Sequence, residues 1–520
     1  MKKKIDSHPQ PKVLDTMAMK IPQELTDKLE QVGITLFEHQ EEGVSWMMNR
    51  EQDHTLIKGG CLSDDPGLGK TNQMLATILA NSKGGRNLII APVSLLNQWR
   101  DAAQKIFPDK RIRICHGKAG CFNSLAEIKN TNPFITIAPY SQTFQSLGGE
   151  YFPTVLHQAH WERVILDEAH ILRNHKSKVF KGCSELKADI RWALTGTPIQ
   201  NSINDLVSIF KFLHVSQLSI QSDFDTLKLQ LIKRRNKNIM AEAYKCLNLH
   251  IEDTEFLDED EKKFYEWLKL YIAGEFAKIE GEKHQMGAVF ELLLRLRQAT
   301  IHPKIVFSGL YRKLVENNGD KQTIAEIHKQ LKIWSNKPST KITKLIEKFA
   351  SHENHTKSLI VSHFTEESNI IYQFLQKTFP SLRIEIFDGS LSLEQRNDMV
   401  RRARSGEIDC MIIQIQCGGV GLNLQMFNKV YIVTPDWNPS NEIQAIARCH
   451  RIGQTSDVEV IKLIIHQDST KPTIDEKIIL VQQIKRDIMA DHLIDETLRF
   501  NERTNGKMNL SMKDFAYLLH

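Results

Sequence analysis

The sequence feature that most constrains the fold is a set of short apolar runs rich in β-branched residues. Such runs are too short for helices, and their separation by helical patterns is typical of buried strands in a parallel sheet. They fall into two groups, within residues 55–200 and 356–465. The sequence therefore predicts an α/β fold of two lobes, each built on a parallel sheet. The runs start at Asn87, Phe134, Arg163, Ser358, Cys410 and Lys429.

Helical patterns occupy the regions beside these groups. From residue 214 to residue 335, Lys, Glu and Leu are frequent while Gly and Pro are few, and after residue 466 apolar residues again recur at helical spacing. We therefore expect helical insertions and a helical C-terminal tail. The expected division is an N-terminal extension (1–34), a first lobe (35–213), a helical insertion or linker (214–335), a second lobe (336–465) and the tail (466–520).

Composition excludes several classes of protein. With 41% hydrophobic residues over 520 positions, the chain can bury real cores, which argues against disorder. The eight Cys form no close pair, so a zinc-binding module is not expected, and no run of 18 apolar residues predicts a membrane span. We expect a soluble, intracellular protein. The net charge of +5 neither requires nor excludes a nucleic-acid partner.

The strongest chemical signal is the segment Ser63–Thr71, which follows a short apolar stretch and opens a predicted helix. Gly67 and Gly69 allow backbone N–H groups to close around phosphates, Lys70 can reach the β- and γ-phosphates, and Thr71 can hold Mg²⁺. The general phosphate-loop pattern has Gly where this chain has Asp64. A surface turn before a helix is the alternative interpretation of these residues alone.

An acidic pair follows a predicted strand about a hundred residues later. Asp167 and Glu168 end the apolar run at 163–166. In a nucleoside-triphosphatase, the first carboxylate holds Mg²⁺ and the second polarises the attacking water. Such a pair also occurs on ordinary surfaces, but its position downstream of a phosphate loop favours a nucleotide site.

Phosphoryl transfer also gains from a cation placed at the developing charge. Arg448 and Arg451 stand three residues apart, about one helical turn, so both guanidinium groups can point to one place. We expect them to reach the nucleotide from the second lobe if the lobes face each other. An exposed helix face is the alternative.

In their order along the chain, these segments resemble the motifs of helicase superfamily 2, and specifically the Swi/Snf family of DNA-translocating ATPases. The resemblance spans residues 36–465. The matching segments in the first lobe are the Gln motif (36–51), the phosphate loop (59–71), motif Ia (88–99), the DEAH box (167–170) and motif III (194–201). Those in the second lobe are motif IV (358–365), the stretch after it (387–396), motif V (416–424) and motif VI (436–454).

The resemblance implies two RecA-like lobes that bind ATP and Mg²⁺ between them while double-stranded DNA lies across both. It implies catalytic roles for Lys70, Asp167, Glu168, Arg448 and Arg451, with Mg²⁺ held by Thr71 and Asp167. Nucleotide-binding positions would be Gln40, which would read adenine, with Asp65, Gly67, Leu68, Gly69, Lys70 and Thr71. Coupling between nucleotide and DNA would involve His170, Thr195, Gly196, Thr197, Gly419 and Gly421.

Candidate DNA contacts come from two matching segments. Small polar side chains and loop N–H groups suit contacts to phosphates that do not read bases. Two basic runs, at residues 233–237 and 401–404, are further candidates, although either could be a solvated helix face. The candidate DNA-binding residues are Ser94, Asn97, Trp99, Asp388, Gly389 and Ser390.

The sequence also departs from the family pattern. Pro66 stands where the family has Met, which removes one N–H group from the phosphate loop, and Gln416 and Cys417 replace the usual Lys-Ala of motif V. The chain most resembles the branch with RING-bearing repair translocases and transcription-termination ATPases, without a RING module.

The function expected from these features is ATP-dependent translocation on duplex DNA that remodels or displaces bound proteins in chromatin, repair or transcription. A protein partner would supply targeting, because nearly the whole chain is motor. Nuclear residence follows from the resemblance, and cytoplasmic residence would follow for a viral or prokaryotic source. Two alternatives stay open: a strand-separating helicase acting on DNA or RNA, and a DNA-binding scaffold with a weakened ATPase.

Overall fold

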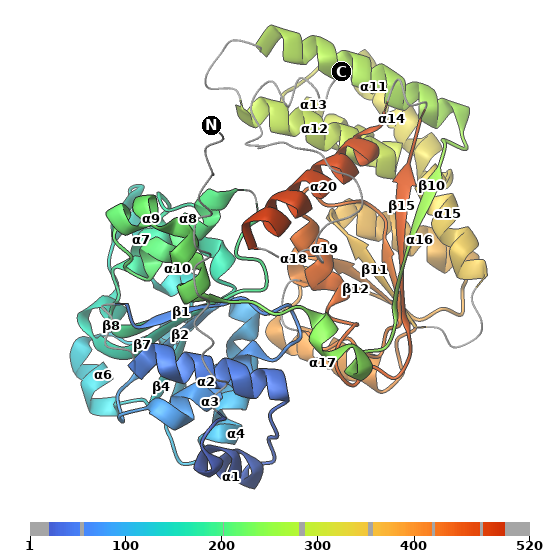
Figure 1. The fold of residues 1–520 in the computed structure, drawn as a ribbon. Coiled ribbons are helices and arrows are strands. Elements are labelled where there is room, and N and C mark those ends of the chain that lie inside the picture. The colour runs from blue at the N-terminus through green and yellow to red at the C-terminus, as the bar shows by residue number, and fades with distance from the viewer. Residues whose placement is uncertain are drawn as a thin grey trace, which may run out of the picture.

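The computed structural model describes residues 20–52, 57–200, 202–279, 286–351, 357–418, 422–467 and 472–493. It has two lobes, each organised around a parallel sheet and linked by extended chain and by a long C-terminal helix (Figure 1). The fold class predicted from the apolar runs, α/β with two parallel sheets and added helices, is confirmed.

The first lobe contains a seven-stranded sheet in the order β3-β4-β2-β7-β8-β1-β9, with every neighbouring pair parallel. Its strands are β1 (Gly59–Leu62), β2 (Asn87–Ala91), β3 (Ile112–Ile114), β4 (Ile135–Pro139), β7 (His160–Asp167), β8 (Lys187–Leu194) and β9 (Ile232–Lys233). A separate hairpin pairs β5 (Gln145–Leu147) with β6 (Glu150–Phe152). The helices of this lobe are α1 (Gln23–Gln31), α2 (Glu38–Gln52), α3 (Lys70–Asn81), α4 (Leu96–Ile106), α5 (Gly117–Gly120), α6 (Leu125–Thr131), α7 (Lys178–Ser184), α8 (Ile203–Phe212), α9 (Gln217–Ser222) and α10 (Phe224–Leu231).

The second lobe contains a six-stranded parallel sheet in the order β10-β15-β14-β11-β13-β12. Its strands are β10 (Leu247–Thr254), β11 (Ser358–Ser362), β12 (Ile384–Phe387), β13 (Cys410–Gln414), β14 (Lys429–Ile432) and β15 (Val458–Ile465). The helices are α15 (Thr340–Ala350), α16 (Thr365–Thr378), α17 (Leu393–Arg404), α18 (Ile415–Gly418) and α19 (Pro439–Ile446). A helical layer above the sheet holds α11 (Glu259–Ile279), α12 (Met286–Ile301), α13 (Pro303–Glu316) and α14 (Lys321–Asn336) (Figure 1).

Two strands, the short β9 and the longer β10, lie where only helices were expected. Strand β10 falls within the stretch 214–335 and pairs along its full length with β15, more than 200 residues later. Its sequence alternates apolar and polar residues, and Leu247, Leu249 and Ile251 are exposed at the sheet edge. The alternation is a strand signal, but the surrounding Lys- and Glu-rich helices hide it.

Helix α20 (Ile474–Leu493) joins the two lobes, and the predicted helical tail is confirmed over these residues. Near its start, Ile474, Ile478 and Val481 pack against α11 and α12, while Met489 near its end packs into the core of the first lobe. In the part of the chain that the structure describes, no helix combines the length and apolar character required to cross a bilayer.

Candidate active site

The predicted nucleotide-binding residues gather at the carboxyl ends of the strands of the first sheet, on the side facing the second lobe. The phosphate loop follows β1, Asp167 ends β7 and Thr195 follows β8. Parallel strands that lie side by side bring their carboxyl ends to one edge, which is where α/β proteins bind ligands. The order β7-β8-β1 therefore explains why these three segments meet.

The phosphate loop has the backbone that its glycines allow. Gly67 and Gly69 have φ angles of +101° and +79°, a region that other residues rarely adopt, and α3 begins at Lys70. The Lys70 ammonium folds back on the loop and donates to the Asp64 carbonyl at 2.7 Å. Gln40 touches the same loop, because its Nε2 donates to the Leu68 carbonyl at 3.2 Å while its Oε1 accepts from the Phe37 N–H. One amide N–H of Gln40 is left for a ligand.

Asp64, which stands where the general pattern has Gly, is fully buried and points away from the loop. Its carboxylate accepts from Nη2 of Arg235 at 2.6 Å and from Nε of Arg235 at 3.0 Å. Gln73 on α3 donates to the same carboxylate at 3.1 Å and accepts from Arg235 at 2.8 Å. A bidentate pair of this kind satisfies a buried charge. The departure from Gly is thus a structural anchor for the loop.

Asp65 is held by the next arginine. Arg234 donates to the Asp65 carboxylate at 3.1 Å and to the carbonyls of Ser63 and Gly196, both at 3.1 Å. Arg234 and Arg235 are only 9% and 8% exposed. The basic run at 233–237, a candidate for DNA contact, therefore braces the phosphate loop, and the structure contradicts a DNA-binding role for these two arginines.

Pro66 has a clear packing partner in the segment after β8. A methyl group at Gly196 would lie only 2.8 Å from Cδ of Pro66, so the two segments need glycine to come this close. Thr195 and Thr197 beside it are buried, and Nδ1 of His170 lies 3.3 Å from the Thr195 hydroxyl. In space, motif III therefore contacts the phosphate loop on one side and the DEAH box on the other, as coupling would require.

The acidic pair occupies a buried and strained end of β7. Burial, together with the neighbouring Glu168 charge, raises the pKa of Asp167 to about 6, and Nε1 of Trp99 donates to its carboxylate at 2.7 Å. Burial alone would raise the pKa of Glu168, but His170 and the cationic Lys70 and Arg448 lower it to about 2. Glu168 has a φ angle of +55°, and such strain is commonly stored at functional sites.

The two predicted arginine fingers lie across from this pair. Arg448 is 6% exposed, and burial lowers its pKa while the charges of Glu168 and Asp167 oppose the shift. Burial and the nearby Arg448 lower the pKa of Arg451 to about 10, and its Nε donates to the Ala447 carbonyl at 2.7 Å. The structure therefore brings the five predicted catalytic residues from two lobes into one buried cluster.

A cleft of about 460 Å³ between the lobes continues from this cluster. Glu168 and His170 line it from the first lobe, and His363, Asp436 and Gln444 line it from the second. The buried Nε2 of Gln444 has no hydrogen-bond partner among the described residues, whereas Oε2 of Glu168 lies 3.3 Å from Nδ1 of His170. Unsatisfied buried polar atoms of this kind mark a place for ligand or water.

The residues fit a magnesium site of the nucleotide-dependent kind. Over the described ranges, no three His, Cys, Asp or Glu side chains form a self-sufficient metal cage. Mg²⁺ bound with a nucleotide takes one or two protein ligands in addition to phosphates and water. Asp167, and Thr71 at the start of α3, could supply those ligands.

The predicted DNA contacts differ in how accessible they are to a ligand. Ser94 and Asn97 are half-buried at the start of α4, and Asp388, Gly389 and Ser390 form a partly to fully exposed turn after β12, where Ser390 donates to Asp388. Trp99 as a DNA contact is wrong, because its side chain is 1% exposed and is bonded to Asp167. In the second basic run, Arg401 and Arg402 pair with acidic neighbours. Gly419 and Gly421 lie outside the described residues.

Two residues of the cleft were not found from the sequence. Lys237 and Tyr244 lie on the chain that crosses between the lobes, next to Gly67 and Arg451. Lys237 belongs to the basic run at 233–237, for which the sequence predicts a DNA contact or a solvated helix face. Tyr244 carries no motif, and only its tertiary position places it here.

A phosphate loop and an acidic strand end on one parallel sheet, faced by arginines from a second, define a two-lobed nucleoside-triphosphatase of the helicase type. The sequence profile of the SNF2-related domain matches residues 39–251, and that of the helicase conserved C-terminal domain matches residues 340–453. The chain belongs to the SNF2-related, or Swi/Snf, family of ATPases.

Its relatives come from a virus, bacteria and eukaryotes. The chain is 28% identical to the probable global transactivator of Orgyia pseudotsugata multicapsid polyhedrosis virus, covering 89% of this chain and 92% of the relative. It is 30% identical to the putative ATP-dependent helicase/translocase YwqA of Bacillus subtilis and 25% identical to the DNA repair protein RAD5 of Yarrowia lipolytica. Those matches cover 87% and 82% of this chain but only 48% and 55% of the relatives, which are therefore much longer.

A solved structure is also similar. The Sulfolobus solfataricus SWI2/SNF2 ATPase core in complex with dsDNA is 25% identical, with 88% of this chain and 92% of that chain covered and a TM-score of 0.37.

Proposed function

We propose that the protein is an ATP-dependent translocase on double-stranded DNA that uses its movement to displace or remodel DNA-bound proteins. The observation that carries the proposal is the composite cleft, in which Arg448 and Arg451 of the second lobe face Lys70 and the acidic pair of the first. A site divided between two lobes makes hydrolysis depend on lobe closure, which is what a stepping motor needs.

The proposed chemistry assigns a task to each group. Lys70 and the loop N–H groups bind phosphates, Glu168 orients and polarises the attacking water, and Arg448 stabilises the charge on the transferring phosphoryl group. A low pKa keeps Glu168 ionised at neutral pH, which this role requires. Mg²⁺, held by Thr71 and Asp167, would neutralise phosphate charge.

Coupling to DNA would run through contacts that join the phosphate loop to motif III. Pro66 packs on Gly196, and His170 lies between Glu168 and Thr195, at 3.3 Å from each. A change at the phosphates can therefore shift the segment 195–197. ATP favours the closed arrangement only through contacts that exist when the lobes meet.

The DNA substrate and the remodelled partner are inferred from the relatives. RAD5 of Yarrowia lipolytica is described as a DNA repair protein, DDM1 of Arabidopsis thaliana as an ATP-dependent DNA helicase, and MOT1 of Saccharomyces cerevisiae as a TATA-binding protein-associated factor. These descriptions support duplex DNA as the track and a bound protein as the target. We further propose residence where that DNA lies, in the nucleus or in the cytoplasm according to the host.

The test is steady-state ATP hydrolysis by the full chain with and without duplex DNA, beside Lys70→Ala and Glu168→Gln. We expect duplex DNA to stimulate turnover and either substitution to abolish it. Displacement of a third strand from a triplex would report translocation, and a forked duplex would report strand separation. Hydrolysis that ignores both DNA and the substitutions would refute the proposal, whereas efficient unwinding of the fork would favour a strand-separating helicase.

A further inference from the structure

The chain that crosses between the lobes passes directly over the nucleotide cleft. We call residues 234–246, between β9 and β10, the interlobe segment. Its first part is fixed to the phosphate loop, because Arg234 and the Lys237 N–H both donate to the Asp65 carboxylate. Its last part is fixed to motif VI, because Nε2 of His450 lies 2.8 Å from the Lys245 carbonyl. The segment thus touches the nucleotide site of both lobes.

Lys237 is the residue at which these two attachments meet. Its backbone N–H lies 3.2 Å from Oδ2 of Asp65 in the first lobe. Its ammonium donates to the His450 carbonyl at 3.0 Å, lies 3.4 Å from Nδ1 of the same histidine and lies 5.2 Å from the centre of the Tyr244 ring. None of these partners carries a negative charge that would balance the buried ammonium.

Tyr244 brings a second unsatisfied group to the same place. Its ring lies 5.2 Å from that of His450, and its buried hydroxyl has no hydrogen-bond partner in the described part of the chain. A methyl group added to Gly67 would lie 3.4 Å from this hydroxyl, 3.8 Å from Cε of Lys237 and 4.0 Å from Cγ of Arg451. All three side chains therefore converge on the glycine turn of the phosphate loop.

The charges around Lys237 favour the binding of an anion. Burial lowers the pKa of Lys237 to about 8; Asp65 opposes the shift, whereas Arg451, Lys70 and Arg448 add to it. Asp65 is already paired with Arg234. A buried cation beside three others is unfavourable unless an anion joins them, and the phosphate loop is a place built for a polyanion.

Resting on the proposed ATPase function, we propose that Lys237 and Tyr244 bind the phosphates of the nucleotide directly. The ammonium exchanges its contact with the His450 carbonyl for a phosphate oxygen, and the Tyr244 hydroxyl donates to the same phosphate chain. The interlobe segment then senses nucleotide by itself, because it is anchored to both lobes.

The competing interpretation is a latch. In that case Lys237 only ties the interlobe segment to His450 and must leave the cleft when nucleotide enters. The two interpretations predict different changes in nucleotide affinity when the Lys237 side chain is removed. If Lys237 binds phosphate, affinity falls, whereas if it is only a latch, affinity is unchanged or rises.

The test is equilibrium binding of a fluorescent, non-hydrolysable ATP analogue to the full chain without DNA, with inorganic triphosphate as a competitor. We expect Lys237→Ala to raise Kd by about tenfold and Tyr244→Phe by about fivefold, since each removes a hydrogen bond to a charged group. Lys237→Arg should restore most of the affinity. Lys245→Ala, which removes an exposed charge from the same segment, is the matched control and should bind as the wild type does.

The triphosphate competitor distinguishes a phosphate contact from a general rearrangement. We expect Lys237→Ala to weaken triphosphate by the same factor as the nucleotide analogue. Wild-type or tighter binding by Lys237→Ala would overturn the proposal. If that variant fails to fold, Tyr244→Phe decides, because it removes a single oxygen atom. Lys70→Ala must lose binding in the same assay: if it does while Lys237→Ala does not, only this inference fails, and if wild-type protein binds no nucleotide, the proposed function fails.

Discussion

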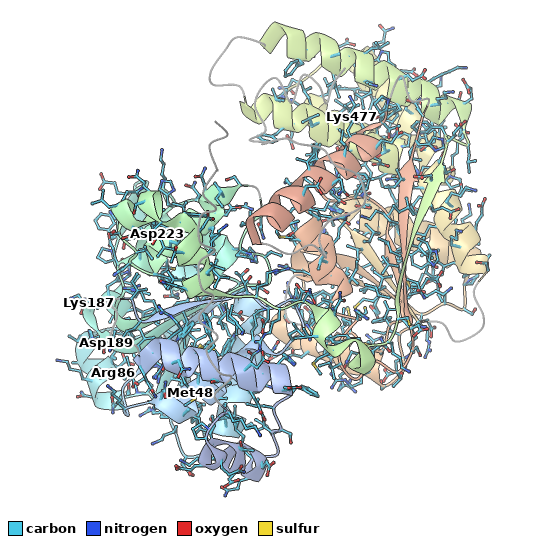
Figure 2. All side chains as sticks on the ribbon, viewed as in Figure 1. Met48, Arg86, Lys187, Asp189, Asp223 and Lys477 are labelled. Atoms are coloured by element: carbon cyan, nitrogen blue, oxygen red, sulfur yellow. The ribbon has the colours of Figure 1, made fainter. Side chains whose placement is uncertain are left out.

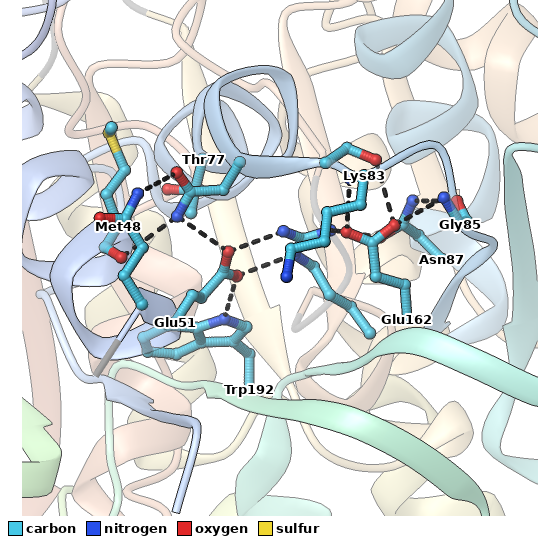
Figure 3. Close-up of polar contacts among 12 residues, drawn as sticks. Met48, Glu51, Thr77, Lys83, Gly85, Asn87, Glu162 and Trp192 are labelled. Atoms are coloured by element: carbon cyan, nitrogen blue, oxygen red, sulfur yellow. Dashed lines mark hydrogen bonds and ion pairs between the residues drawn. The ribbon is translucent and has the colours of Figure 1, made fainter. Parts of the chain in front are cut away.

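The first lobe contains two buried clusters of charge, at opposite ends of the same elements. One lies at the amino end of β7 and centres on Arg163 and Glu51 (Figure 3). The other lies at the carboxyl end of β7 and faces the second lobe. Helices α2 and α3 contribute residues to both clusters, so the two clusters can be compared within one structural frame.

The Arg163 cluster is paired throughout. Both oxygens of Glu51 accept from Arg163, at 2.8 and 2.7 Å, and Trp192 donates to Glu51 at 2.9 Å. Glu162 accepts from Arg163 at 2.6 Å and from the N–H groups of Lys83 and Gly85 (Figure 3). Because each charge has opposite partners, this cluster ties α2, β7, β8 and the chain after α3 into one frame.

The cleft cluster differs in having cations gathered together with unsatisfied atoms. Lys237 and Arg451 have lowered pKa values, and the Tyr244 hydroxyl has no hydrogen-bond partner within the described ranges. Burying charge without a partner is costly. The difference teaches that the Arg163 cluster stabilises the fold, whereas the gathered cations of the cleft cluster favour the binding of a polyanion.

The largest expected effect is the loss of ATP turnover when an arginine of the cleft cluster is removed. Arg448→Ala should lower kcat for ATP by about 1000-fold or more, as for removal of an arginine finger. Unfolding in urea should change far less than turnover, because repulsion from the nearby Arg451 offsets the attraction of Arg448 to Glu168 and Asp167. Steady-state hydrolysis and urea titration measure the two properties. A large loss of stability with unchanged kcat would mean that Arg448 is a structural residue and the contrast between the clusters is false.

At the Arg163 cluster we expect a substitution to lower stability and to leave nucleotide binding unchanged. Arg163→Ala leaves the Glu51 carboxylate buried without its main partner, so the free energy of unfolding should fall by about 3–5 kcal/mol. The protein that remains folded should still bind nucleotide. Lys187→Ala, whose side chain is exposed at the outer edge of the first lobe (Figure 2), is the control and should change stability little. An Arg163→Ala protein of normal stability would contradict the structural role.

Asp64 tests whether the two kinds of cluster are connected. Asp64→Asn keeps the shape of the side chain but removes the charge that faces Arg235, so we expect a loss of about 2–3 kcal/mol in stability. Asp223→Asn, at an exposed position of the same lobe, is the control (Figure 2). Because Arg235 also anchors the interlobe segment, nucleotide affinity should fall as well. A stable variant with normal affinity would show that the loop holds its shape without this pair.

The sequence predicted the parts of the protein whose signal is local. The buried strands and the helix after the phosphate loop are each encoded in a short stretch, and the structure has β2, β4, β7 and α3 at those places. Arg448 and Arg451 were expected at helical spacing, but they lie in the turns that follow α19. The grouping of the apolar runs predicted two lobes, and the family resemblance implied that the lobes bind the nucleotide between them.

What the sequence did not predict depends on long-range packing. Trp99 was assigned to DNA through the resemblance of residues 88–99 to motif Ia, but its side chain donates a hydrogen bond to Asp167, 68 residues away. Arg235 was part of a basic run, but it is paired with Asp64, 171 residues away. No local pattern distinguishes a charge that faces solvent from one that is buried against a distant carboxylate.

The smallest expected effect is the pH dependence of nucleotide affinity through Lys237. Its folded-state pKa is lowered from 10.5 to about 8, so below pH 8 the folded and unfolded chains both carry the proton, and between about 8 and 10.5 only the unfolded chain does. The stability of the free protein should therefore rise over that window relative to Lys237→Met. Nucleotide binding needs the charged form, so affinity should fall by about tenfold between pH 7 and pH 9.

Lys237→Arg should remove this dependence, because arginine stays protonated throughout the range. The titratable groups around the ammonium are Asp65, Lys70, Tyr244, Arg448, His450 and Arg451. Changes in the nucleotide's own protonation affect both proteins equally, so the ratio of their Kd values isolates position 237. If the ratio of the two Kd values stays constant from pH 7 to pH 9, the Lys237 proton does not take part in nucleotide binding. Only the arginines of the cleft would then distinguish its charge from that of the Arg163 cluster.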